Sequence, residues 1–410
     1  MRKNRLPLLI GVTLVSVTFG AMAQTMTPIK PAYEIPTGAP KNEDGPRGMY
    51  LTDGVAVYPS IGLSVGRDDN LFLSSSNKTS STVYSLAPGF KLQARRQDSV
   101  FTLDYSGLAS QYQQSRADDF YDFRLGGTGE FVMSSRAGLR LLVEHIEGHD
   151  ARGSTDRSTA GTPDKYRNFG GNVLFAYGGN EARGRFEFEA GDYRKTYLNN
   201  RASTFLSDRN TYSFAGRFFG RFATRTWFLV EARSTNLNYV SPISLADSRE
   251  KRYLAGVTWD ATAATSGTIK VGRIRKDFDS SRVADFSGTG WDASVQWTPL
   301  TYSRVGFFAV KDFNESTGVG DFILSKRYGV NWAHDWNSRL TTIANLNRSK
   351  DDFINGSRND TTDNIGFKLN YKLHRWLILG GEYTNADRTS NNSIYRYKRN
   401  IYMFTLGATL

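Results

Sequence analysis

The residues best suited to chemistry in this sequence are few and widely spaced. The chain has four histidines and no cysteine. His145 and His149 lie beside Glu147 and Asp150, a grouping that would suit a metal site or a hydrolytic His/Asp pair. Four-residue spacing aligns two side chains on a helix, but not on a strand that continues into a loop. We therefore favour the interpretation that His145 and His149 are solvated histidines of a loop. It predicts no catalytic, cofactor-binding or metal-binding residue, and a protein that is not an enzyme.

A second group with chemical potential is a set of basic side chains at alternating positions. Guanidinium groups bind carboxylates through two parallel hydrogen bonds, and a low-dielectric wall concentrates their field. Lining one surface, such a set would form a cationic track for an anionic sugar polymer. The simpler alternative, which we favour, is that these charges pair with acidic side chains on neighbouring strands. The eight candidates are Arg124, Arg140, Arg185, Arg217, Arg221, Arg233, Arg252 and Lys368.

Strands would have to position these side chains, because polar and apolar residues alternate with a period of two. Phe186 and Phe188, for example, alternate with Arg185, Glu187 and Glu189. Aromatic residues stand at the ends of many apolar faces, where membrane-interface girdles fall. So many alternating segments favour a transmembrane barrel over a soluble sandwich. The clearest segments lie at 121–133, 185–189, 212–222, 252–260, 291–297 and 364–373.

The composition agrees with an all-β barrel that spans a membrane. After the N-terminal region the sequence lacks the roughly 18 consecutive apolar residues of a membrane helix. Its mean hydropathy is −0.46 and aromatic residues make up 13% of the chain. A barrel reconciles these values, since only alternate side chains face lipid. The net charge of +12 suggests anionic lipid headgroups, lipopolysaccharide included, or an anionic solute as partners. Arg273, Arg275 and Lys276 are candidates for lipopolysaccharide phosphates at the outer rim.

The connections between strands alternate between tight turns and longer polar loops, as an up-and-down barrel requires. Eight tight turns and nine loops predict eighteen strands over 54–410, within two either way. With both ends in the periplasm, the longest loop, 149–166, is extracellular. The tight turns are expected at 96–98, 134–136, 178–180, 223–225, 265–267, 299–301, 336–338 and 374–375. The loops are expected near 74–81, 115–119, 149–166, 198–209, 241–250, 279–288, 315–320, 352–361 and 388–394.

The N-terminal region has the order of a secretory signal peptide. Arg2, Lys3 and Arg5 precede an apolar stretch and an Ala-Met-Ala cleavage site ending at Ala23, which predicts export across the inner membrane and removal of residues 1–23. Residues 24–53 hold five of the 11 prolines and are expected to form an extended periplasmic or lumenal segment. Residues 54–410 would form one barrel domain, which either the proline-rich segment or an infolded 149–166 loop would constrict.

Two hairpins carry a family resemblance. LAGVTWDATAATSGTIKVG at 254–272 and ASVQWTPLTYSRVGFF at 293–308 each comprise a strand, a tight turn after a tryptophan and a returning strand. They resemble the repeated hairpins of the outer-membrane β-barrel porins encoded with exopolysaccharide synthesis genes. The resemblance implies passage of a secreted polysaccharide across the outer membrane, with periplasmic export proteins as further partners. It transfers no binding residue, because that family has no residue fingerprint for a substrate.

Three functions therefore stay open. The first is a conduit that secretes an exopolysaccharide, and the second is a small-solute porin, general or sugar-selective. The third is a structural or adhesive barrel. Between sixteen and eighteen strands close around a lumen too wide for side chains to fill, which favours a pore. No nucleic-acid partner is expected.

Overall fold

Antiparallel strands joined in sequence order make up most of the chain. The computed structural model describes residues 48–156, 161–179, 182–260 and 264–410. Each strand from β2 to β19 pairs with its sequence neighbours, and β19 also pairs with β2, so the ladder closes into a ring. The predicted barrel of eighteen strands is confirmed. The strands are β1 (Met49–Thr52), β2 (Val55–Asp68), β3 (Ser81–Arg96), β4 (Ser99–Tyr112), β5 (Phe120–Ser134), β6 (Ala137–Asp150), β7 (Asp164–Tyr177), β8 (Gly184–Tyr197), β9 (Arg209–Ala223), β10 (Thr226–Tyr239), β11 (Ser248–Trp259), β12 (Thr265–Phe278), β13 (Phe286–Leu300), β14 (Ser303–Glu315), β15 (Phe322–Asp335), β16 (Leu340–Ile354), β17 (Asn359–His374), β18 (Leu377–Ser390) and β19 (Tyr397–Thr409).

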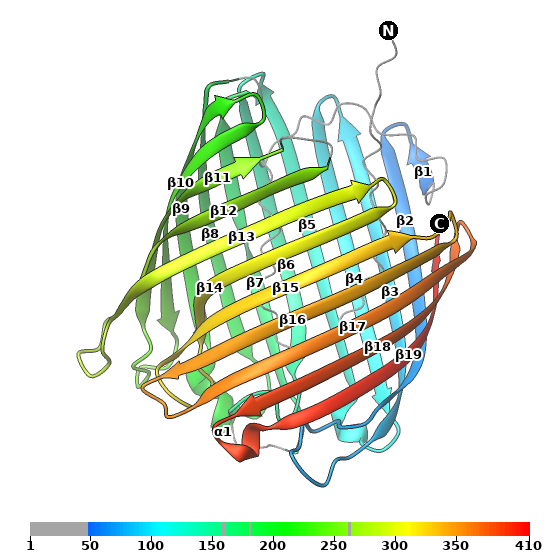
Figure 1. Ribbon diagram of the computed structural model, residues 1–410, viewed down its shortest axis with the longest axis vertical. Coiled ribbons are helices and arrows are strands. Elements are labelled where there is room, and N and C mark those ends of the chain that lie inside the picture. The colour runs from blue at the N-terminus through cyan, green and yellow to red at the C-terminus, as the bar shows by residue number, and fades with distance from the viewer. Residues whose placement is uncertain (1–47, 157–160, 180–181, 261–263) are drawn as a thin grey trace.

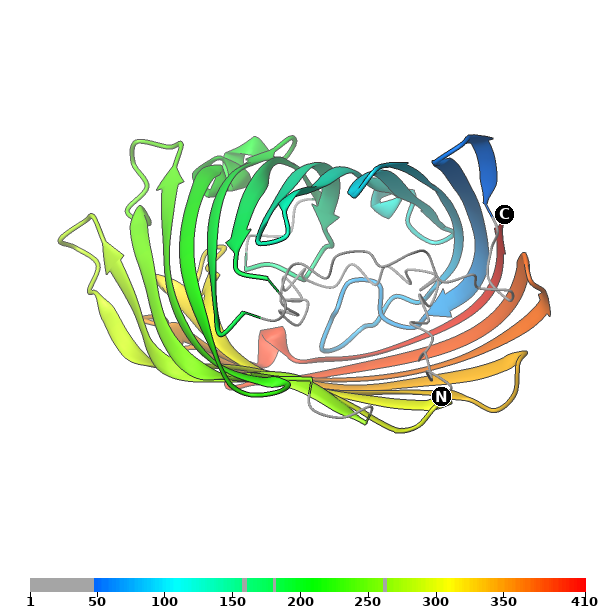
Figure 2. The same cartoon turned by 90° about the horizontal axis from the view of Figure 1, so that it is seen from above.

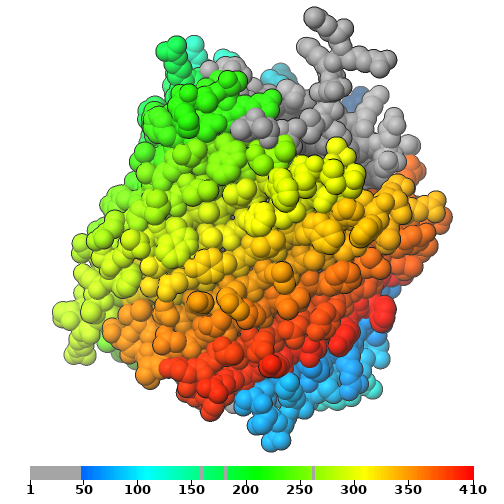
Figure 3. All heavy atoms as spheres, in the orientation of Figure 1, coloured from blue at the N-terminus to red at the C-terminus, as the bar shows by residue number. Residues whose placement is uncertain are grey.

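Alternation along each strand separates an outer apolar face from an inner polar face. On β8, Phe186 and Phe188 are 46% and 57% exposed on the outside, whereas Arg185 and Glu187 between them are 7% and 0% exposed. The same division runs round the ring, because residues paired across strands share a face. Seen side-on, the strands are steeply tilted (Figure 1), and their side chains form a continuous wall over β13–β19 (Figure 3). Seen along the barrel, the ring is wider in one direction than in the other (Figure 2).

The connections follow the predicted alternation, with three corrections. One end of the ring carries eight connections of two to six residues, and the other carries nine of four to thirteen residues. In bacterial barrels the longer loops are extracellular. Thr265–Gly267 was expected to be a turn, but these residues begin β12, and Gly267 makes room for the Trp259 ring. Two loops are markedly shorter than expected. The one at 149–166 is shorter because β6 extends to Asp150 and β7 begins at Asp164, and the one at 352–361 because β16 extends to Ile354 and β17 begins at Asn359.

The described N-terminal residues add one short strand that the sequence did not predict. β1 pairs with the start of β2, within the segment expected to be extended. The predicted signal peptide and residues 24–47 lie outside the described residues. The loops also contain short helical turns: η1 (Arg116–Asp118), α1 (Arg201–Thr204), η2 (Phe205–Ser207) and η3 (Ser393–Tyr395). In the described part of the chain, no helix has the length and apolarity needed to cross a membrane.

The inner face is not polar throughout. On β10–β12, Leu229, Leu254 and Ile274 point inward and are no more than 2% exposed. Phe219 on β9, the residue that interrupts the alternation in the sequence, is also buried, at 2% exposure. Ile274 packs in a buried apolar cluster with Phe313, Phe322 and Leu324. The polar lining expected from the sequence is therefore interrupted there.

Close approach of β11 and β12 in this region requires glycine. A Cβ atom on Gly272 would lie 1.9 Å from the carbonyl oxygen of Tyr253, a backbone atom that cannot rotate away. We expect Gly272→Ala to destabilise the barrel by about 1–3 kcal/mol through this overlap. The matched control is Gly381→Ala, because no heavy atom lies within 4 Å of a Cβ there. The folded fraction after refolding into detergent, read from heat-modifiable gel mobility, should fall for Gly272→Ala alone. Equal losses for both variants would contradict the explanation.

Candidate functional site: the inner face and the outer mouth

A network of ion pairs covers the inner face of β8–β14. Arg217 on β9 lies at its centre and donates to Glu231 and Glu189 at 2.7 Å each. Lys270 on β12 continues the network, at 3.5 Å from Glu231 and 2.9 Å from Asp292. Except for Glu189 and Asp292, these side chains are at most 5% exposed. A charge buried this deeply is tolerated only with partners, so the pairs hold the strands together.

Most of the eight basic candidates pair with carboxylates on the inner face. Arg124 bonds to Glu144 at 2.9 Å and also contacts Asp104. Arg185 lies 2.9 Å from Glu187 and Arg233 lies 3.3 Å from Glu189. Further pairs are Arg252 with Asp312 and Lys368 with Glu382.

The other two candidates have different surroundings. The Arg221 guanidinium lies over the Trp227 ring at 5.3 Å. Arg140 lies opposite Glu130 in the strand register, and no ion pair is recorded for it among the described residues. Six of the eight candidates thus have carboxylate partners. Among these six pairs, those of Arg124, Arg217 and Lys368 join neighbouring strands, as the simpler alternative expects. Arg185 pairs within its own strand, and Arg233 and Arg252 reach strands further round the ring. A role of these residues in a solute path stays a prediction.

The three basic residues proposed for the outer rim divide between the two faces. Arg273 and Arg275 point outward with Tyr253 and Val271, and Arg275 contacts Asp277. Lys276 points inward and is fully buried, at 2.8 Å from Glu250 and 2.7 Å from Glu315. The expectation that Lys276 reaches lipopolysaccharide is therefore wrong, because strand parity turns it toward the inside of the ring. For Arg273 and Arg275 this expectation stays a prediction.

The histidine pair near the outer end also differs from expectation. His149 is 9% exposed, so it is not a solvated loop histidine. Its Nδ1 lies 2.9 Å from Asp122 on β5, and its ring lies 4.2 Å from the Phe120 ring. His145 is partly exposed, and its Nε2 lies 3.5 Å from Glu147. Within the described residues, no group of three or more His, Asp or Glu side chains is placed to hold a metal ion.

The outer mouth contains a loop segment that crosses the ring. Arg152 fixes the start of this 151–156 segment: it donates to Asp118 at 2.8 Å and to Ser115 at 2.9 Å. Its guanidinium also lies 4.1 Å from the centre of the Phe72 ring, in the loop after β2. Gly153 has φ +78°, and a side chain there would meet the Phe72 carbonyl oxygen at 2.3 Å. The start of the crossing segment is therefore packed against the loops on its own side of the mouth.

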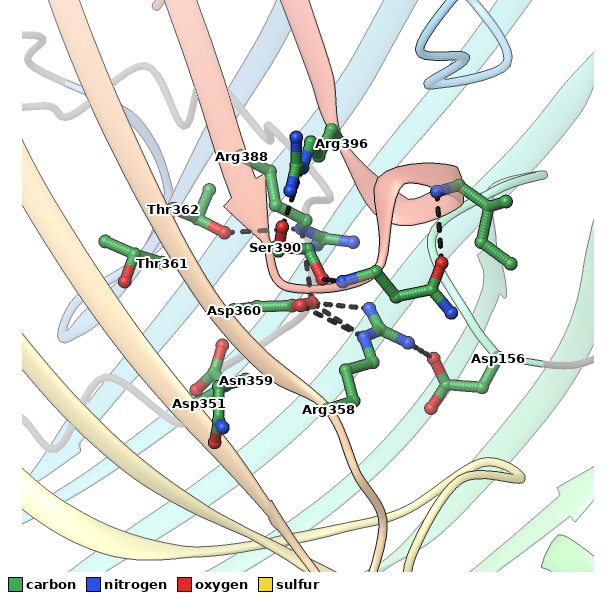
Figure 4. Close-up of polar contacts among 12 residues, drawn as sticks. Asp156, Asp351, Arg358, Asn359, Asp360, Thr361, Thr362, Arg388, Ser390 and Arg396 are labelled. Atoms are coloured by element: carbon green, nitrogen blue, oxygen red, sulfur yellow. Dashed lines mark hydrogen bonds and ion pairs between the residues drawn. The ribbon is translucent and has the colours of Figure 1, made fainter.

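The far end of the crossing segment is held by loops on the opposite side of the barrel. The Asp156 amide donates to Thr317 Oγ1 at 3.0 Å, in the loop after β14. The Asp156 carboxylate accepts a hydrogen bond from Arg358, which follows β16 and also binds Asp360 (Figure 4). The Arg358 guanidinium also contacts the rings of Phe353 and Tyr395, at 4.3 and 3.4 Å from their centres.

This contact is buried, and it narrows the mouth. The Arg358 and Asp156 side chains are 5% and 6% exposed. β6 and β16 lie on opposite sides of the ring in strand order, so the loop between β6 and β7 spans the opening, as expected of an infolded loop. The sequence did not identify Asp156, Thr317 or Arg358. A buried arginine in a short loop has no distinctive pattern until its cross-barrel partner is known.

A closed ring of strands with an apolar exterior and a charged interior defines an outer-membrane channel protein. Residues 45–409 match the family model described as "Putative beta-barrel porin 2", and the chain belongs to this porin family. The family and the fold are those of channels of the bacterial outer membrane.

Several solved structures share the fold. One is OccK2 (OpdF) of Pseudomonas aeruginosa in complex with glucuronate, with TM-score 0.50, 13% identity and coverage of 88% of this chain and 100% of that chain. OccAB3 of Acinetobacter baumannii has TM-score 0.49, 14% identity and coverage of 88% and 100%. A BenF-like porin from Pseudomonas fluorescens Pf-5 has TM-score 0.49, 10% identity and the same coverage. No curated protein matches the sequence.

Proposed function

We propose that the protein is an outer-membrane porin for small hydrophilic solutes. The observation that carries this proposal is the 151–156 segment, which crosses the outer mouth and is fixed on the far side through Asp156 and Arg358. A fixed crossing divides a wide opening into narrower passages. Channels select solutes by pore width and by the polar groups that line the pore, so a narrowed, charged barrel suits single small solutes.

Secretion of an exopolysaccharide was the first function that the sequence suggested. The family match is to porins and does not extend to an operon or a polymer. A chain of sugars would have to thread past the crossing segment, whose buried ion pair makes displacement costly. The small-solute function is therefore the better supported of the two, and polymer passage and a structural or adhesive role become outcomes of the test.

The test is solute uptake by a Gram-negative host that lacks its own general porins. Cells expressing the chain should take up small sugars faster than cells with an empty vector. Glucuronate belongs in the set of solutes, because OccK2, which shares the fold, was solved in complex with it. Uptake no faster than that of the empty-vector control, with the barrel present and folded in the outer membrane, would reject the proposal. Secretion of an exopolysaccharide and a structural or adhesive role would then be the functions left to test.

A further inference from the structure

The inner face of β15–β17 carries a tract of asparagines. Asn331 lies directly opposite Asn345 in the register of β15 and β16, and Asn347 lies directly opposite Asn364 on β17. Asn370 follows further along β17, on the same face. All five point away from the outward apolar side chains of their strands. The first four are neighbours in the register, and Asn370 lies beyond Gly366 and Lys368 on the same face. The five residues are here called the asparagine tract.

Glycines beside the tract let the amides lie along the wall. Gly306 on β14 pairs with Asn331, and Gly329 on β15 pairs with Asn347. A Cβ atom on either glycine would come within 2.2 Å or 2.3 Å of the neighbouring Oδ1 atom. Each amide therefore occupies the space that a side chain would otherwise fill. Because glycine has no side chain to project into the lumen, a solute can approach the inner face closely at this point.

The amides of the tract are not engaged by the rest of the described chain. Across the described ranges, none of the five asparagine side chains makes a hydrogen bond, and Asn370 Oδ1 is buried without a partner. Each amide offers two N–H donors and one acceptor oxygen. Asn331 is exposed and Asn345, Asn347 and Asn364 are partly exposed, so water can bind these amides, and the hydroxyl groups of a solute can take the place of that water.

An aromatic ring completes the surface. Phe308 on β14 points inward, because it pairs with Gly329 on the inner face, and the residue is 37% exposed. A Cβ atom on Gly329 would lie 2.1 Å from the Phe308 ring, so the ring stands over this glycine beside Asn347. The consecutive Phe307 and Phe308 break the alternation in the sequence. An exposed ring beside amides that both donate and accept is a surface suited to a sugar ring, with apolar C–H groups and hydroxyls.

We propose that the asparagine tract and Phe308 bind uncharged, hydroxyl-rich solutes, such as neutral sugars, as they pass through the barrel. This inference rests on the proposed porin function and names its solute class. Neutral solutes are favoured because Lys368, the charged residue between Asn364 and Asn370, lies 3.6 Å from Glu382. Amides pair with hydroxyl groups as donors and as acceptors, without demanding a charge.

The experiment measures block of the ion current by maltotriose in planar bilayers containing the full chain. Maltotriose should block the wild-type current transiently, and glucuronate should block it less. Phe308→Ala and the double variant Asn331→Ala/Asn347→Ala should each weaken maltotriose binding about tenfold, the loss expected from one or two hydrogen bonds or a ring contact. Salt conductance should persist in both variants, which shows that the barrel is folded and open.

The matched control is Asn172→Ala, which removes an amide from the inner face of β7, away from the tract. It should leave maltotriose block unchanged. An open channel that maltotriose does not block, or equal effects in all three variants, would overturn the inference and leave the pore intact. Absence of any ion current through the folded wild-type chain would instead reject the porin function itself.

Discussion

Replacing Asp156 by Ala should raise the single-channel conductance, on the order of twofold, because the crossing segment loses its buried ion pair with Arg358 on the far side of the mouth. Asp156 is the carboxylate that joins this segment to Arg358, and its backbone amide binds Thr317. Held at this end only by the backbone hydrogen bond to Thr317, the segment should move away from its crossing position and leave the opening wider. The measurement is single-channel recording of the purified protein in planar bilayers. Current noise should rise with conductance as the segment moves.

The control for this prediction is Asp279→Ala, which removes an exposed carboxylate from another extracellular loop. It should leave the conductance unchanged, since no side-chain contact of Asp279 is recorded in the described chain. Arg358→Ala should reproduce the effect of Asp156→Ala, and the double variant should add little to either single change, because both act on one contact. Unchanged conductance in Asp156→Ala would mean that the crossing segment does not limit the current.

Replacing Arg217 by Met should lower the free energy of unfolding by about 3–5 kcal/mol, because Glu189 and Glu231 would lose their shared cation in a buried site. Arg217 is the hub of the inner network and is 5% exposed. The measurement is urea unfolding of the protein in lipid bilayers or detergent. Arg140→Met is the matched control: it removes an inner-face arginine that has no recorded ion pair, and it should cost less than about 1 kcal/mol. Losses of equal size would show that the network adds nothing beyond the packing of long side chains.

The pairing of inner-face arginines with carboxylates also affects the ion selectivity expected of the pore. Neutralising Arg185, Arg217 and Arg221 together should reduce the preference for anions if these residues form a cationic track. Arg185 and Arg217 are paired with carboxylates, and paired charges offset each other's field. An unchanged selectivity in bilayer recordings would discard the track and leave the pairs as structural contacts.

Strand periodicity made the barrel predictable. Outward residues such as Phe186, Phe188 and Tyr253 must meet hydrocarbon, so the period of two survives in the sequence whatever lies inside. Turn chemistry then fixed the strand number, since each loop or turn interrupts that alternation. The error at Thr265–Gly267 shows the limit of this reasoning. Small residues typical of turns also serve in strands, where they accommodate a neighbouring ring such as Trp259.

Contacts across the lumen were not predictable in the same way. Arg358 and Asp156 are 202 residues apart in the sequence, and nothing local to either residue indicates the other. The burial of Leu229, Leu254 and Ile274 on the inner face was missed for a related reason. Period-two analysis assigns a face to each residue, but it does not show where a ring flattens enough for inner side chains to meet.

Swelling of proteoliposomes containing the purified chain tests the central claim most directly. Neutral mono- and disaccharides should enter and swell the vesicles, whereas dextran polymers should be excluded, because the fixed 151–156 segment admits only small solutes. Swelling with dextran at a rate similar to that with the small sugars would contradict the small-solute porin and point to a conduit for polymers. No swelling with any solute would contradict an open pore altogether.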